Sequence, residues 1–174
     1  MTATVAAAAR IVLLAIVAAI VYGIGHDLVT AHVCVEYFTV AHPPLFRTEN
    51  PVLLALGWGV VATWWVGLLL GLLLAHAALR GPGPLRTARS LVRPIAALLA
   101  IMAGGALLAG SVAWLGVRAG WFALVGPFAT RIPAEHHAGF VADGAAHLTS
   151  YLLGALGGVV LARRVRRSRS YLPS

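Results

Sequence analysis

The sequence has few charged residues and very few cysteines, and each shortage excludes a class of protein. Charged residues make up 10% of the 174 residues, whereas a soluble domain carries roughly a quarter. The single cysteine, Cys34, excludes an internal disulfide framework and a Cys-x-x-Cys metal motif. The patterns His-Glu-x-x-His, repeated His-x-x-His-His and Glu-x-x-His do not occur. Sites that depend on them, including a ferritin-like di-iron site, are therefore not expected.

Apolar sequence is abundant instead. Hydrophobic residues make up 60% of the chain, and the mean hydropathy is +0.90. A transmembrane helix needs about 20 apolar residues, and the pattern predicts an all-α integral membrane protein, a four-transmembrane-helix bundle in the lipid bilayer. The first apolar run is not followed by a small-x-small cleavage site, so we interpret it as an uncleaved helix. The single predicted domain, residues 1–174, has spans at about 5–25, 52–79, 94–117 and 133–162 and a basic tail at 163–174.

Lysine is absent, and the 13 basic residues are all arginines. Ten of them lie in three regions on one predicted side of the membrane, the N-terminus, the turn at 80–93 and the C-terminal tail: Arg10, Arg80, Arg86, Arg89, Arg93, Arg163, Arg164, Arg166, Arg167 and Arg169. Cytoplasmic loops are rich in arginine and lysine, so we expect both termini to be cytoplasmic. Arginines just beyond apolar runs are topology signals, and nucleic-acid binding is not expected. All five acids and six of the seven histidines fall on the opposite, outer side.

Residues 25–44, GHDLVTAHVCVEYFTVAHPP, concentrate polar groups between the first two spans. Residues 33–40 are rich in β-branched and aromatic side chains, which favour extended chain, so residues 28–40 could be extended or helical. Either conformation would place His32 and Glu36 on one face. We expect an irregular, partly extended segment that covers the fourth helix as a lid. We interpret Cys34 as a small packing residue in preference to a metal ligand.

A second polar cluster lies on the predicted fourth helix. His136, Phe140, Asp143, His147 and Tyr151 recur at spacings of three or four residues and form one stripe. Ionisable groups at membrane depth usually face a bundle interior or a wet cavity. Imidazole and carboxylate together suit a divalent transition metal: zinc, iron, manganese or copper. The predicted ligands are His26, Asp27, His32, Glu36, His136, Asp143 and His147.

Other interpretations stay open. A lone interfacial histidine is more often hydrogen-bonded or solvated than a metal ligand, and His42 and His137 fit that description. The chain could be a non-catalytic subunit or assembly factor, because the GxxxG steps Gly67–Gly71 and Gly154–Gly158 could recruit partner membrane subunits or a second copy. A proton or ion path, or an external pH sensor, is a third possibility. The sequence does not decide whether the protein is an enzyme.

One stretch has a resemblance. Tyr22-Gly23-Ile24, His26-Asp27, Thr30 and Glu36-Tyr37-Phe38-Thr39 are similar to a motif of uncharacterised four-span bacterial membrane proteins. The match covers roughly residues 22–42. It implies the four-span fold and a location in the bacterial inner (plasma) membrane, and it assigns no catalytic residue.

Overall fold

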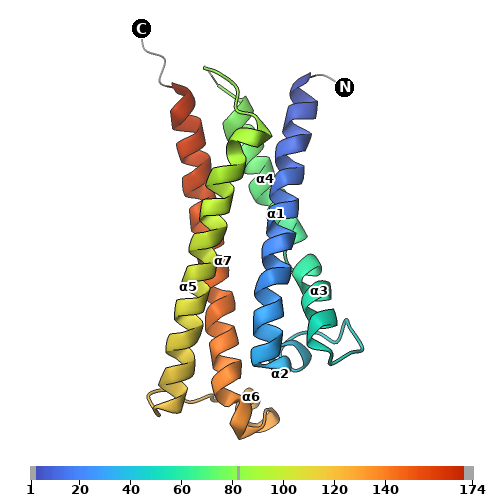
Figure 1. Cartoon of the computed structure of the whole chain (residues 1–174), viewed down its shortest axis with the longest axis vertical. Helices are drawn as coiled ribbons and strands as arrows, with labels where there is room; N and C mark the ends of the chain where they lie inside the picture. Colours follow the sequence, from blue (N-terminus) through green and yellow to red (C-terminus); the bar gives the residue numbers. More distant parts are fainter. Residues whose placement is uncertain (1–2, 82, 171–174) are drawn as a thin grey trace.

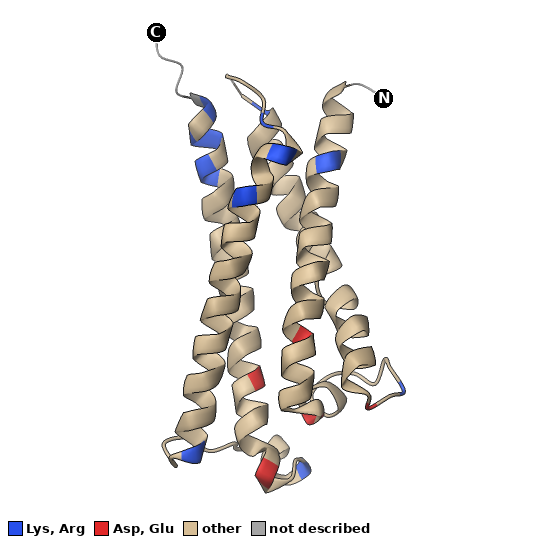
Figure 2. Cartoon of the chain, in the orientation of Figure 1, with Lys and Arg blue, Asp and Glu red and all other residues tan. Residues whose placement is uncertain are grey.

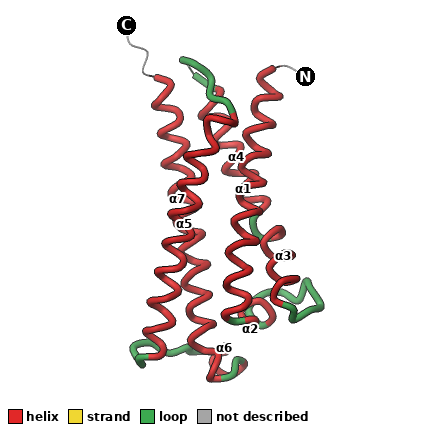
Figure 3. Tube along the Cα trace, in the orientation of Figure 1, coloured by secondary structure: helices red, strands yellow, loops and turns green. Residues whose placement is uncertain are grey.

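The computed structural model describes residues 3–81 and 83–170, and in this part of the chain helices and loops occur without a strand (Figures 1 and 3). The helices are α1 Ala3–Val33, α2 Val35–Thr39, α3 Pro51–Val61, α4 Trp64–Leu79, α5 Ala88–Arg118, α6 Pro127–Arg131, a 3-10 turn η1 Ala134–His136, and α7 His137–Ser170. Four stretches are long and apolar enough to cross a membrane: Ala3–Val33, Pro51–Leu79, Ala88–Arg118 and Ala134–Arg169. The predicted all-α four-helix bundle is confirmed.

The bundle consists of two groups of helices (Figure 1). In one group α1 packs along α3 and α4, and in the other α5 packs along α7. Contacts of α4 with α7 and of α1 with α5 join the two groups, whereas α1 and α7 make few close backbone contacts. Polar residues of both helices meet in the space between α1 and α7.

The two ends of the bundle differ in charge (Figure 2). The start of α1, the loop between α4 and α5, and the end of α7 share one end, which holds the ten arginines named above; we call it the arginine-rich end. The opposite, acidic end holds α2, α6 and η1. All five acids lie in the half of the bundle nearest this end.

The arginine-rich half has an apolar core. Ile11 from α1, Leu74 from α4, Leu91 from α5 and Leu161 from α7 belong to one buried cluster. Arg169 closes the cluster at the end of α7, where it is 2% exposed. Its guanidinium donates hydrogen bonds to five backbone carbonyls, that of Ala77 in the last turn of α4 and those of Arg80, Gly81, Gly83 and Pro84 in the α4–α5 connection. The predicted basic tail therefore continues α7 as far as Ser170, and its Arg169 packs against the bundle. Residues 171–174 lie outside the described part.

The second predicted span is interrupted at Ala62–Thr63, between α3 and α4. The Thr63 hydroxyl donates to the carbonyl of Gly59, one turn back, a bond that commonly bends helices. The bend lies where α3 crosses α1: a Cβ atom added to Gly59 would lie 2.5 Å from the backbone nitrogen of Ile24. Close approach of two backbones at this crossing therefore requires glycine.

Both predicted GxxxG steps pack inside the chain. Gly67 and Gly71 face the backbone of α1 at Ile16 and Val12. Gly154 and Gly158 face Met102 of α5 and Leu70 of α4, respectively. Partner subunits remain a prediction, but these glycine faces serve the bundle itself.

Helix ends follow local sequence. Asn50 caps α3: its side-chain oxygen accepts hydrogen bonds from the backbone nitrogens of Val52 and Leu53 at 3.0 and 3.1 Å, and Pro51 is the first helical residue. Thr87 caps α5, whose start at Ala88 places Pro94 inside the helix.

The segment that follows α1 is mostly helical. Helix α1 continues to Val33, Cys34 alone has extended backbone angles (φ −153°, ψ 100°), and α2 begins at Val35. The extended part is therefore much shorter than the sequence suggests. The expected common face of His32 and Glu36 is wrong, because the change of direction at Cys34 separates the two residues into different helices.

Candidate functional site

A buried polar cluster lies between α1 and α7 in the acidic half of the bundle. Helix α1 contributes His26 and Asp27, and α7 contributes His147. One ligand atom from each of these three residues lies within 4.8 Å of the other two. Asp27 and His147 are each 5% exposed, and His26 is half-buried. Three of the seven predicted ligands are thus brought together, and this group could hold a metal ion.

The hydrogen bond that His147 makes to a backbone carbonyl shows which of its two ring nitrogens carries a proton. Its Nδ1 lies 2.8 Å from the backbone carbonyl oxygen of Asp143. Because a carbonyl only accepts, Nδ1 carries a proton and donates it to this bond. The other ring nitrogen, Nε2, lies 3.3 Å from Oδ1 of Asp27. Nε2 and the carboxylate then face each other either through a second ring proton or through a cation that both bind.

Two buried polar atoms of the cluster have no hydrogen-bond partner among the described residues: Nε2 of His26 and Oδ2 of Asp143. Buried polar atoms are almost always satisfied, and an unsatisfied one calls for a specific explanation such as an ion or a ligand. Asp143 is 1% exposed. It lies one turn before His147 and outside the three-residue ligand group, although its carboxyl interacts electrostatically with that of Asp27.

Helix α2 covers the cluster and takes the place of the predicted lid. The Tyr37 ring lies 4.6 Å from that of His147 between centroids, and the Phe38 ring lies 5.8 Å away. The His26 ring meets His147 edge-on at 4.5 Å. Burial beside Tyr151, Asp143 and Asp27 raises the pKa of Tyr37. Its phenol therefore stays protonated over the cluster, which these aromatic rings shield from the acidic end.

Glu36 and His136 form a second, separate pair nearer the acidic end. Oε1 of Glu36 lies 2.6 Å from Nδ1 of His136, and this pair joins α2 to η1. The Cys34 thiol donates to Oε2 of Glu36 at 3.3 Å. Burial and this hydrogen bond raise the pKa of Cys34 to about 12. The thiol thus stays protonated, which agrees with a packing residue and not with a thiolate ligand.

The other three histidines of the acidic half each bond a backbone carbonyl. His32 is exposed, and its ring bonds the carbonyl of Leu28 in its own helix. His42 bonds the carbonyl of Tyr37, and His137 bonds that of Ile132. These rings belong to the hydrogen-bonded class that the sequence suggests for His42 and His137. His32, although predicted as a ligand, is not brought to the cluster.

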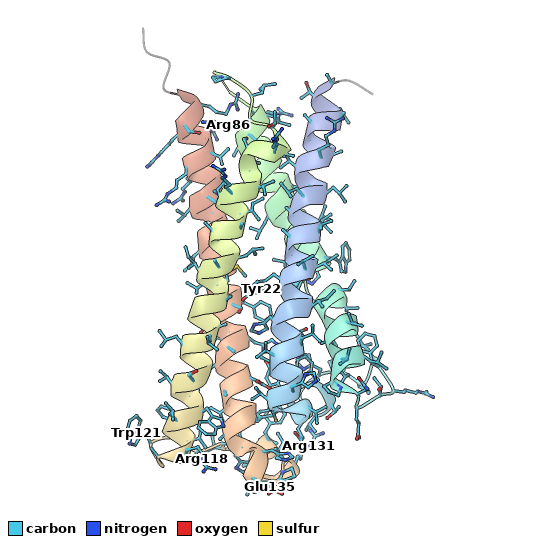
Figure 4. The ribbon with its side chains drawn as sticks, viewed as in Figure 1. Tyr22, Arg86, Arg118, Trp121, Arg131 and Glu135 are labelled. Carbon is cyan, nitrogen blue, oxygen red and sulfur yellow. The ribbon has the colours of Figure 1, made fainter. Side chains whose placement is uncertain are left out.

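Two further residues, Tyr22 and Ser150, border the cluster, and neither is among the site residues predicted from the sequence. The Tyr22 hydroxyl lies 2.7 Å from Oγ of Ser150, and Figure 4 shows Tyr22 between α1 and α7. This bond closes the cluster on the side of the apolar core. A helical signal for both existed, because Tyr22 precedes His26 by four residues and Ser150 follows His147 by three.

Comparison of the chain with models of protein families, with curated proteins and with solved structures found no match.

Proposed function

We propose that the chain is a multi-pass membrane protein that binds one divalent transition metal ion through His26, Asp27 and His147. The observation that carries the proposal is the convergence of two imidazoles and a carboxylate from α1 and α7 within 4.8 Å, with the Asp27 and His147 side chains buried. Burial matters because exposed acidic clusters are common on protein surfaces, whereas a buried carboxylate requires a partner.

The donor set supports this proposal chemically. Two nitrogens and one oxygen suit zinc, iron, manganese or copper. Metal-bound histidines usually donate their other ring N–H to a carbonyl or carboxylate, and His147 makes this bond to Asp143. A cation between Nε2 of His147 and Oδ1 of Asp27 would also satisfy the two atoms that face each other at 3.3 Å.

Three protein ligands leave at least one coordination position open. Catalytic zinc sites have this composition, with water in the open position. A metal in such a site lowers the pKa of bound water toward 7 and so supplies hydroxide at neutral pH. This arrangement would support metal-dependent hydrolysis. A closed structural site would need a fourth protein ligand.

We place the site near the outer face of a bacterial inner membrane, with both termini in the cytoplasm. The start of α1 and the end of α7 share the arginine-rich end (Figure 2). Arginine enrichment is the usual mark of the cytoplasmic side. The acidic end with its lid α2 would then face outward, and the metal would be acquired from that side.

A proton path through the membrane is favoured less. The buried polar side chains extend inward from the cluster to Tyr22 and Ser150. Beyond them, the described residues form the apolar core around Ile11 and Leu74. Arg169 is the one buried charged residue described in that half, and its partners are backbone carbonyls.

Metal analysis of the detergent-purified protein tests the proposal. Protein from metal-replete cells should contain about one transition-metal ion per chain, because the site offers a single three-ligand group. His147→Ala and Asp27→Asn should each lower the metal content to background, since each removes one of the three ligands.

His32→Ala is the matched control. His32 lies on the same helix as His26 but is exposed and bonds Leu28, so its removal should leave the metal content unchanged. Wild-type protein that lacks metal, or equal metal loss in His147→Ala and His32→Ala, would refute the proposal. A folded state of each variant is verified by size-exclusion chromatography and helical circular dichroism.

A further inference from the structure

An apolar groove runs beside the polar cluster, between α1, α5 and α7. Its volume is about 780 Å³, within the range of small-molecule sites. The rims carry exposed apolar side chains such as Val29 of α1 and Leu107 and Trp114 of α5, which are 59%, 69% and 42% exposed. In a membrane-spanning bundle, a groove with such rims opens toward lipid.

The groove follows from how the helices pair. Helix α5 packs along α7, and α1 packs along α3 and α4. Small residues then line the space between α1 and α5, among them Gly25, Ala106 and Gly110. A Cβ atom added to Gly25 would meet no atom within 4 Å. The sequence leaves this space open instead of filling it with a large side chain.

Two ionisable residues of the polar cluster are among those that line the groove. Asp143, which is 1% exposed, and His26 both line it. These two residues carry the two buried atoms that lack a hydrogen-bond partner among the described residues, Oδ2 of Asp143 and Nε2 of His26. A ligand in the groove that carried a polar head would satisfy a buried group that otherwise costs free energy.

The chemistry of these atoms selects the head group. A hydroxyl both donates and accepts a hydrogen bond. It therefore pairs with Asp143 whether this residue is a carboxylate or a carboxylic acid, and with either protonation state of the His26 nitrogen. An anionic head would meet the carboxyls of Asp27 and Asp143, and a desolvated ammonium is costly in an apolar groove. Hydroxyl is the best match.

We propose that the groove binds a single-chain amphiphile with a hydroxyl head group, whose chain lies between α1 and α5 and whose hydroxyl bonds Asp143. Such a molecule reaches the groove laterally from the bilayer. The inference rests on the groove and Asp143, and it does not require a metal in the neighbouring site.

Photolabelling in lipid nanodiscs tests this proposal, in the presence of a chelator so that metal binding plays no part. The probe is hexadecanol with a diazirine near the end of its chain. Labelling should map to α1, α5 and α7. Unlabelled hexadecanol should compete about tenfold better than palmitate or hexadecane, because one hydrogen bond to a buried acid corresponds to about this factor.

Two sets of variants distinguish binding of the probe in the groove from labelling by probe that is dissolved in the bilayer. Ser111→Trp places a large ring in the groove, whereas Val112→Trp places the same ring on the exposed face of α5 outside it. Labelling should fall in the first variant and persist in the second. Asp143→Leu keeps the branching and the number of heavy atoms of the side chain and replaces both polar atoms by methyl groups, so the preference for hexadecanol over hexadecane should disappear.

Equal competition by the three compounds would overturn the proposal, as would a preference for hexadecanol that survives in Asp143→Leu. Equal labelling of Ser111→Trp and Val112→Trp would also overturn it. Labelling blocked by a second copy of the chain, detected as a crosslinked dimer, would show that a helix and not an amphiphile occupies the groove. Because the metal content is measured separately, failure here leaves the metal proposal intact.

Discussion

His147 contacts residues of α1, α2 and α7 around the proposed metal site. One ring nitrogen is fixed by the carbonyl of Asp143, and the other faces Asp27 across 3.3 Å. Tyr37 and His26 hold the ring from two sides at centroid distances of 4.6 and 4.5 Å. An imidazole oriented in this way loses little conformational freedom on binding a cation, which is how a supporting set of contacts increases metal affinity.

At the same scale, Cys34 shows how burial controls reactivity. Its pKa of about 12 follows from burial and the hydrogen bond to Glu36. Because thiolate is the reactive form, we expect native Cys34 to react with maleimide at about pH 8 on the order of 1,000-fold more slowly than an ordinary exposed thiol. Glu49→Cys in a Cys34→Ser background supplies that exposed thiol. Similar labelling rates for the two would contradict this account, and labelling of Cys34 in denaturant shows that the reagent is active.

Several residue-level features of the site were readable from sequence. The positions of His26, Asp27, Asp143 and His147 near one another follow from four spans and the helical stripe of α7. The positions of His32 and Glu36 relative to each other do not, because His32 lies on an exposed position of α1 and the extended residue Cys34 then changes the direction of the chain before Glu36. Spacing rules assume one continuous element, and they fail at such a break.

At the scale of elements, the contact between the lid α2 and η1 depends on Glu36, which pairs with His136. Burial alone would raise the pKa of Glu36, but hydrogen bonds from its own backbone, Cys34 and His136 outweigh burial and lower its pKa. The ionised form is therefore favoured in the folded state. Its contribution to stability is fully present above the ordinary glutamate pKa of about 4.3 and is lost as the pH falls through the lower folded value.

The corresponding experiment is thermal unfolding in detergent between about pH 6 and pH 3. Glu36→Gln should lower the melting temperature at the upper end of this range and reduce the loss of stability on acidification. Glu49→Gln, at an exposed position, should follow the wild-type curve. Identical pH profiles for Glu36→Gln and wild type would show that the pair with His136 does not hold the lid.

The crossing of α1 and α3 gives a second test at this scale. An added methyl group at Gly59 would collide with the backbone of Ile24, whereas one at Gly104 would meet open space. We expect Gly59→Ala to destabilise the protein by about 1–3 kcal/mol through overpacking. Gly104→Ala should stabilise it by up to about 1 kcal/mol through helix propensity. Unfolding titrations measure both, and a stabilising Gly59→Ala would contradict the close crossing.

The elements themselves were largely predictable. The long apolar runs define where the membrane helices lie. The bend at Thr63 was not predictable, because it depends on where α1 touches α3, and a local pattern carries no such information. The β-branched residues 33–40 suggested extended chain, but burial of Phe38 and Tyr37 against α1, α3 and α7 stabilises a short helix there.

At the scale of the whole molecule, the charge distribution assigns a direction to the bundle (Figure 2). In a Cys34→Ser background, Glu49→Cys near the acidic end should react with a membrane-impermeant maleimide added to intact spheroplasts. Leu85→Cys, exposed at the arginine-rich end, should react only after the membrane is permeabilised. The reverse pattern would invert the proposed orientation and place the metal site toward the cytoplasm.

The two halves of the molecule have different tasks in this account. The arginine-rich half is packed around Ile11 and closed by Arg169, which fixes α7 against the α4–α5 connection. The acidic half leaves α1 and α7 apart and fills the space with ionisable and aromatic side chains. A rigid apolar half thus positions the ligands of the polar half, as a binding site built on helices requires.

X-ray absorption spectroscopy at the zinc edge of zinc-loaded protein identifies the atoms that bind the metal. We expect two imidazole nitrogens at about 2.0–2.1 Å and additional oxygen ligands from Asp27 and water, with no sulfur. His147→Ala should lose imidazole scattering, and His32→Ala should give the wild-type spectrum. A spectrum with only oxygen ligands, or one that does not change in His147→Ala, would contradict a metal site formed by His26, Asp27 and His147.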